Sequence, residues 1–190
     1  LRYQCRVCHS ELGFPMRRGA TDIAKTDFEN GLYCGACHDG KTAFTGRLEG
    51  AECGRCHGET ALPPKDRFLR LQADLPRADF GNGIDWAKAM ESGRITPKAS
   101  LAGGVEPLEF DKDLVLTPEN PTVPPVRFPH RTHTRVLDCD NCHPDIFDVK
   151  LKGTYRLSMK ESLKGRFCGV CLLRVAFPFD DCVRCHVNVW

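Results

Sequence analysis

Five copies of one short motif, Cys-x-x-Cys-His, constrain this 190-residue chain more than any other feature of its sequence. A sixth pair, Cys168 and Cys171, is followed by Leu172, so all twelve cysteines belong to CxxC pairs. Two thiols three positions apart can reach the two vinyl groups on one edge of a porphyrin, and the adjacent histidine can then bind the iron. The motif therefore predicts covalently attached haem.

The predicted attachment and iron-binding residues follow from these motifs. The thiols are Cys5, Cys8, Cys34, Cys37, Cys53, Cys56, Cys139, Cys142, Cys182 and Cys185, and the histidines are His9, His38, His57, His143 and His186. Zinc sites and disulfides also use CxxC, but zinc does not need a histidine at the next position, and disulfide scaffolds vary their cysteine spacing. We therefore expect five haems c, or six if Cys168 and Cys171 also carry one.

The composition suits a protein whose cofactors form its core. Only 8% of the residues are aromatic, and the chain contains 17 Gly and 13 Pro. We expect a haem-cored multihaem cytochrome c that is mostly coil, with short α-helices on the motifs and little or no β-structure. The net charge is +2 with the charges interspersed, and each haem adds two propionates, so nucleic acid is not an expected partner. No stretch approaches eighteen apolar residues, so no transmembrane segment is expected.

The two ends of the sequence superpose when one is shifted by 134 positions. Cys5 and Cys8 then fall on Cys139 and Cys142, and the second pair falls on the incomplete one. Such a repeat indicates duplication of a structural unit. We predict a first trihaem repeat over 1–62, N-terminally incomplete, a connector over 63–125 and a second repeat over 126–190.

Leu172 stands where the first repeat has His38. A haem at this place would lack its proximal ligand. Two outcomes remain open: the haem is absent and leaves a dithiol or disulfide, or it is attached with abnormal ligation. We favour a haem site that has lost its ordinary ligand.

A low-spin haem needs a second strong axial ligand, usually His or Met. Five histidines belong to motifs, which leaves His130 and His133. Solvated loop histidines are the simpler interpretation, yet these two precede a haem motif in a chain short of ligands, and we expect them to bind iron. Among the methionines, Met159 is the best placed, because it lies nine residues before the incomplete pair; Met16 and Met90 are weaker candidates.

The connector contains neither cysteine nor histidine and is punctuated by Pro and Gly. Its sequence predicts one short helix over 86–92, with Asp85 as N-cap and Gly93 as the stop. We interpret the connector as a segment that wraps the haem core; a docking surface for a partner is the alternative.

The chain resembles the tandem trihaem cytochromes of the c-seven type (class III) over residues 1–60 and 126–190. The resemblance rests on the histidine doublet ahead of a CxxCH motif, Met159 and Gly165 before the CGxC pair, and the Ala-Phe step before the last motif. It implies that His130 binds the haem of His143, that Met159 binds the haem of His186, and that His133 faces the site at Leu172. It also implies electron transfer in the periplasm or outside the cell.

We therefore predict an electron carrier rather than an enzyme. A multihaem reductase of the nitrite or hydroxylamine kind, with an open haem at Leu172, is the alternative, and a structural subunit of a filament or membrane complex is compatible with electron transfer. Other redox proteins or neighbouring cytochrome subunits are the expected partners, including further copies of the chain in a homo-oligomer. Covalent haem attachment implies export, and the chain shows no signal peptide, so we expect a leader or further sequence ahead of Leu1.

Overall fold

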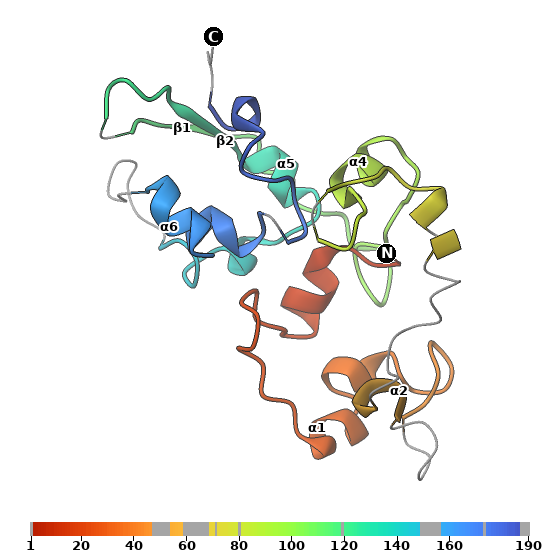
Figure 1. Cartoon of the computed structure of the whole chain (residues 1–190). Helices are drawn as coiled ribbons and strands as arrows, with labels where there is room; N and C mark the ends of the chain where they lie inside the picture. The colour runs from red at the N-terminus through yellow and green to blue at the C-terminus, as the bar shows by residue number, and fades with distance from the viewer. Residues whose placement is uncertain are drawn as a thin grey trace.

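The computed structural model describes residues 2–46, 54–58, 69–70, 72–79, 81–118, 120–148, 157–172 and 174–186. Short helices and one small sheet are joined by long coil segments (Figure 1). In chain order the elements are η1 (Val7–Glu11), α1 (Lys25–Glu29), η2 (Tyr33–Ala36), α2 (Gly54–His57), α4 (Trp86–Glu91), β1 (Asp113–Leu116), β2 (Val126–Pro129), α5 (His130–Thr134), η3 (Cys139–Asn141), α6 (Met159–Leu163), η4 (Phe167–Val170) and η5 (Cys182–Arg184). The predicted fold class is confirmed: coil dominates, and short helices carry the CxxC motifs.

The duplication inferred from the sequence has a structural counterpart at the same offset. Helix α1 and turn η2 pack together in the first repeat, and α6 and η4 do so in the second, each element starting 134 residues after its equivalent. Tyr33 and Phe167 occupy equivalent positions, and both have a φ of +48°, a left-handed conformation that is uncommon for aromatic residues. The same strained backbone therefore leads into the second CxxC pair of each repeat.

A close backbone contact explains the first variable residue of each of these pairs. A Cβ atom on Gly35 would lie 2.1 Å from the carbonyl oxygen of Phe28, and one on Gly169 would lie 1.7 Å from that of Ser162. Only glycine allows the turn to approach the preceding helix this closely. The contact fixes the second CxxC pair against α1 in one repeat and against α6 in the other.

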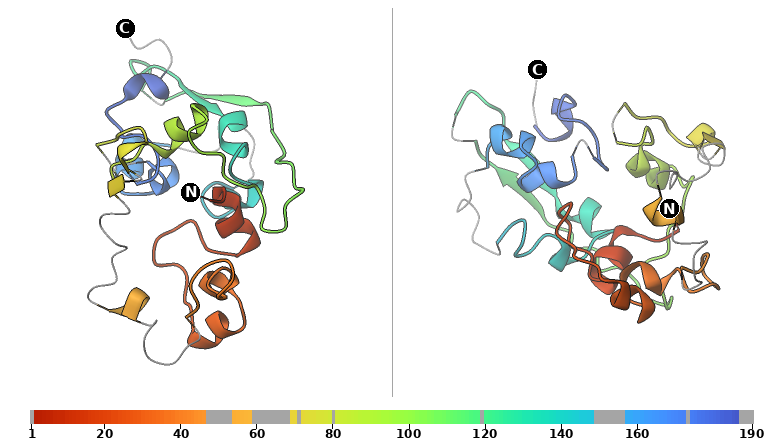
Figure 2. Two further views of the ribbon diagram at one scale, coloured as in Figure 1. Left: turned by 90° about the vertical axis from the view of Figure 1, so that its right-hand side faces the viewer. Right: turned by 60° about the horizontal axis from the view of Figure 1, so that its bottom comes forward.

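The sheet positions the histidine doublet, which consists of His130 and His133. Strands β1 and β2 are antiparallel, with Leu114 opposite Phe128, and α5 begins directly after β2. The last motif docks on the same strand, because Arg127 N donates to Cys185 O at 2.8 Å and Val126 bridges His186. Figures 1 and 2 place this sheet and α1 toward opposite ends of the molecule. The sequence did not reveal β1, which lies within the connector.

Helix α4 agrees with the prediction for the connector. The Asp85 side chain accepts a hydrogen bond from Lys88 N at 2.9 Å, as an N-cap does. The helix ends at Glu91, one residue earlier than predicted, and Ser92 is the C-cap before Gly93 at a φ of +69°. Its inner face contributes the fully buried Ala89.

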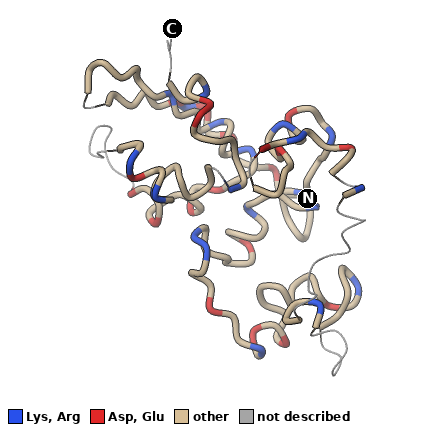
Figure 3. The backbone as a smooth tube through the Cα atoms, viewed as in Figure 1, with Lys and Arg blue, Asp and Glu red and all other residues tan. Residues whose placement is uncertain are grey.

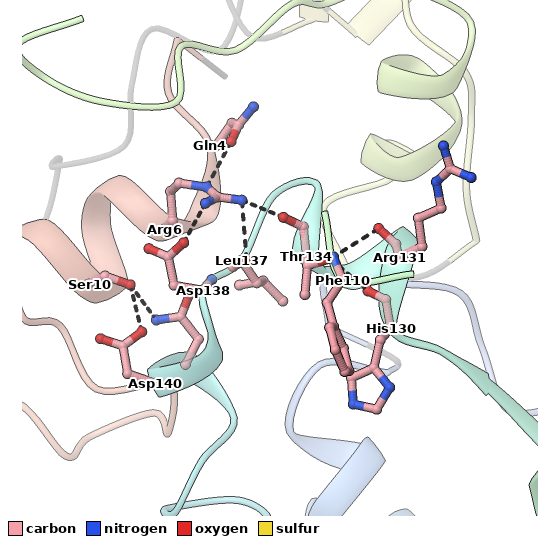
Figure 4. Close-up of polar contacts among 11 residues, drawn as sticks. Gln4, Arg6, Ser10, Phe110, His130, Arg131, Thr134, Leu137, Asp138 and Asp140 are labelled. Atoms are coloured by element: carbon pink, nitrogen blue, oxygen red, sulfur yellow. Dashed lines mark hydrogen bonds and ion pairs between the residues drawn. The ribbon is translucent and has the colours of Figure 1, made fainter. Parts of the chain in front are cut away.

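The two repeats meet at a polar joint built around Arg6, a variable residue of the first motif (Figure 4). The Arg6 guanidinium is buried, and it forms an ion pair with Asp138 and donates to Thr134 O at 2.6 Å and Leu137 O at 3.2 Å. Ser10 extends the joint: its hydroxyl donates to Asp140 Oδ1 at 3.0 Å and accepts a hydrogen bond from Asn141 Nδ2 at 2.9 Å. The first motif of each repeat therefore lies against that of the other.

Charges of both signs are distributed over the described chain, with Lys and Arg interspersed among Asp and Glu (Figure 3). Within the same ranges, no helix combines the length and apolar character needed to cross a bilayer.

Candidate functional site: the CxxC turns and the histidines

One backbone turn presents four of the CxxC pairs. The residue after the second cysteine donates its N–H to the carbonyl of the first, at 2.9 Å for His38, His143 and His186 and at 3.1 Å for Leu172. Each first cysteine lies in a 3-10 turn, in which side chains three positions apart are eclipsed. Both thiols of a pair therefore project to the same side, as attachment to one porphyrin edge requires. The incomplete pair adopts the same turn as the complete ones.

Within the part of the chain that the structure describes, backbone carbonyls orient the rings of six histidines. In each of them Nδ1 lies 2.5–2.9 Å from a carbonyl oxygen, and a carbonyl can only accept, so Nδ1 carries the proton. The pairs are His9–Phe14, His38–Phe44, His130–Lys112, His133–Pro129, His143–Phe147 and His186–Pro124. This tautomer leaves the Nε2 lone pair available to a metal, and such a second hydrogen bond is typical of metal-binding histidines.

The doublet on α5 shares an aromatic support. The Phe128 ring stacks on His133 with centroids 4.3 Å apart, and it meets His130 edge-on at 5.1 Å. Burial lowers the pKa of His133, against a smaller opposing contribution from its hydrogen bond to Pro129. The ring therefore stays neutral around pH 7, and a neutral imidazole is the form that binds iron.

The remaining predicted residues are placed differently. Met159 is the first residue of α6 and is 47% exposed, so its thioether is not committed to a core. His57 lies in α2, where the motif helix is exposed. Cys53 lies outside the described residues. The other eleven cysteines are described, and none of them forms a disulfide.

The thiols of different motifs lie near one another, as their mutual electrostatic effects show. Burial raises the pKa of Cys8, and the neighbouring Cys37 and Cys34 raise it further. Burial likewise raises the pKa of Cys171 to about 11, with additional contributions from Cys142 and Cys5. The incomplete pair thus lies beside the first motifs of both repeats.

The last motif also adjoins the incomplete pair. Burial raises the pKa of Cys168, and the nearby thiol of Cys185 is the next contribution. Together with the neighbours of Cys171, this contact places the incomplete pair where three complete motifs approach one another.

The polypeptide has the surface of a chain built around large cofactors. Its accessible area is 13629 Å², whereas a folded protein of 21.3 kDa exposes about 9,000 Å². Among the described residues the buried apolar side chains are Val7, Ile84, Ala89, Ile146 and Val170. A cavity of about 310 Å³ beside Cys139 is lined by Leu108, Leu137 and polar neighbours. Paired thiols, oriented imidazoles and exposed apolar side chains fit haem c.

A bare metal ion fits this donor set less well. No three His, Cys, Asp or Glu side chains converge on one point within the described ranges, and the thiols lie instead in pairs along separate turns.

The joint residues Arg6 and Asp138 could not be identified from the sequence. Arg6 is one of the variable positions of CxxCH, where any residue is allowed, and Asp138 precedes a motif. The 134-residue offset aligns Arg6 with Asp140 in the sequence, whereas its ion-pair partner is Asp138. The duplication therefore gives no signal for this ion pair.

The chain matches the family model of cytochrome c7 and related cytochrome c over residues 1–58 and 126–187. A solved structure, the C-terminal hexaheme fragment of GSU1996, is similar at 26% identity, covering 97% of this chain and 82% of that chain with a TM-score of 0.36. No curated protein matches the chain. None of these findings favours a reductase. The matched residues are the two repeats that carry the motifs, so the chain belongs to the family of cytochrome c7 and related cytochromes c, and it is a multihaem c-type cytochrome that transfers electrons.

Proposed function

We propose that this cytochrome is a continuous electron conduit formed by two trihaem-like repeats, residues 1–62 and residues 126–190 with one degenerate site, and that residues 63–125 are a wrapping connector. The observation that carries this proposal is the joint at Arg6, where the first motifs of the two repeats lie against each other. Electrons tunnel between closely packed haems, and the protein sets their spacing and potentials. Because the joint holds two motifs in a fixed relative position, it also sets the distance over which an electron passes from one repeat to the other.

The proposed proximal ligands are the five motif histidines. On the opposite face, His130 binds the haem of His143, Met159 binds the haem of His186, and His133 faces the site at Leu172. Support comes from the available Nε2 atoms of both doublet histidines and from the exposed thioether of Met159. The first repeat has Lys25 where the second has Met159, so the two units differ at the equivalent haem.

The expected setting is the periplasm or the cell exterior, where covalently bound haem proteins operate, and the expected partners are other redox proteins or neighbouring cytochrome subunits. His130 and His133 cannot supply a second ligand to every haem. A filament, a membrane complex or a homo-oligomer would bring further ligands from an adjacent chain.

Redox titration of the loaded protein tests the proposed ligand set. We expect reversible reduction in several steps, and we expect Met159→His to lower the potential of one haem, because a thioether ligand raises the potential relative to imidazole. Met90→His is the matched control, since Met90 lies on α4 in the connector, and it should leave the titration unchanged. Equal titration curves for wild type and Met159→His would contradict the role of Met159.

A further inference from the structure

The turn at Cys168 and Cys171 keeps the geometry of a haem-attachment site although its histidine is replaced. Leu172 N donates to Cys168 O at 3.1 Å, close to the 2.9 Å of His38 N to Cys34 O in the equivalent turn. The left-handed Phe167 and the close approach of Gly169 to α6 also repeat those of the first unit. A strained turn of this shape places the two thiols of a CxxC pair on the same side.

We propose that Cys168 and Cys171 hold a sixth haem whose iron is open on the side of Leu172 and there binds a small uncharged diatomic ligand such as carbon monoxide. This inference rests on the proposed function, because it assigns a second role to one haem of the same conduit. Leu172 has no atom that can bind iron, so the residue that follows this pair cannot supply the proximal ligand that His38 supplies at the equivalent place in the first repeat.

The opposite face of this haem receives one histidine at most. After the five motif histidines are assigned, His130 and His133 remain, and both have Nδ1 bonded to a carbonyl with Nε2 available. His130 is assigned to the haem of His143 in the proposed ligand set, which leaves His133. An iron with one imidazole and one open position is high-spin, whereas an iron with two strong ligands is low-spin.

The residues around the open side favour a neutral ligand. Val170 is buried and Leu172 is half-buried, so apolar side chains line the turn. Arg174 is a nearby cation: its backbone N–H donates to Cys171 O at 3.2 Å, and its guanidinium extends toward Gly165. Arg174 follows the turn in the sequence, and its positive charge would attract an anion. Nitrite is therefore the ligand that would compete with carbon monoxide.

The site adjoins both repeats. Its thiols lie near Cys5, Cys142 and Cys185, which belong to three different complete motifs. A ligand on this iron would therefore act at the crossing point of the conduit.

The experiment combines intact mass with carbon monoxide titration of the dithionite-reduced full chain. We expect six covalent haems, and we expect Leu172→His to lower the carbon monoxide stoichiometry by one while the haem count stays at six. The matched variant is His143→Leu, which creates the same vacancy in the same kind of turn and should raise the stoichiometry by one. Comparing variants in this way cancels any carbon monoxide bound by ligand-poor haems of the first repeat.

Three results would overturn the inference. They are five haems with Cys168 and Cys171 open to thiol alkylation, an unchanged carbon monoxide stoichiometry in Leu172→His, and binding of nitrite but not carbon monoxide at this haem. In each case the reversible reduction of the other five haems would still support electron transfer, so the two proposals fail separately.

Discussion

Produced without haem attachment, the chain should show the far-ultraviolet circular dichroism of a largely unfolded polypeptide and no cooperative thermal transition. The described α-helices have four to six residues, and isolated helices shorter than about 12 residues are marginal in water. The described core is small, and the accessible area exceeds that of an ordinary folded protein of this mass by roughly half. The haems must supply the apolar contacts that hold these short helices in place.

The measurement compares the haem-free chain with the loaded protein in the same buffer. The loaded protein should unfold cooperatively and give helical dichroism. A haem-free chain that retained both properties would show that the polypeptide builds its own core.

Replacing Arg6 by alanine should lower the free energy of unfolding of the loaded protein by about 1–3 kcal/mol, because a buried guanidinium loses its hydrogen bonds while its ion-pair partner, Asp138, is partly exposed to water. Arg6 is 4% exposed and bonds to Asp138 and to the carbonyls of Thr134 and Leu137. Alanine leaves these three acceptors without their donor; the hydrogen bond to Thr134 O is buried, whereas the Asp138 carboxylate is 38% exposed and can bind water instead. Denaturant unfolding of the loaded protein provides the measurement.

Two control variants separate this effect from a general loss of charge. Arg94→Ala removes an exposed guanidinium that bonds to Asp74 O in the connector, and it should change the stability by less than about 0.5 kcal/mol. Arg6→Lys keeps the charge but loses the fork of donors, so an intermediate effect is expected. Equal stability of Arg6→Ala and Arg94→Ala would show that the joint does not hold the repeats together.

The repeated unit could be read from the sequence because its spacing is fixed by covalent chemistry. Cysteines that attach one porphyrin must keep their separation, and the 134-residue offset is therefore visible without any structure. The structure places α1 and α6 at the same offset, including the strained Tyr33 and Phe167. The helix of the connector was predictable for a different reason, since Asp85 and Gly93 are strong local start and stop signals.

The joint and the sheet were not predictable because they depend on contacts between distant residues. Arg6 lies 132 residues from Asp138, and β1 pairs with a strand ten residues further on without a tight-turn signal. The orientation of the His186 ring likewise depends on a distant group, Pro124 O, which is 62 residues away along the chain. Local sequence patterns contain no information on such partners.

Injection of a single electron into the oxidised protein, followed by time-resolved absorption, tests the conduit most directly. Our account predicts that the electron redistributes among haems of both repeats at a rate independent of protein concentration, because the passage lies within one molecule. Redistribution whose rate rises in proportion to protein concentration would contradict it, since the two repeats would then exchange electrons only when separate molecules collide.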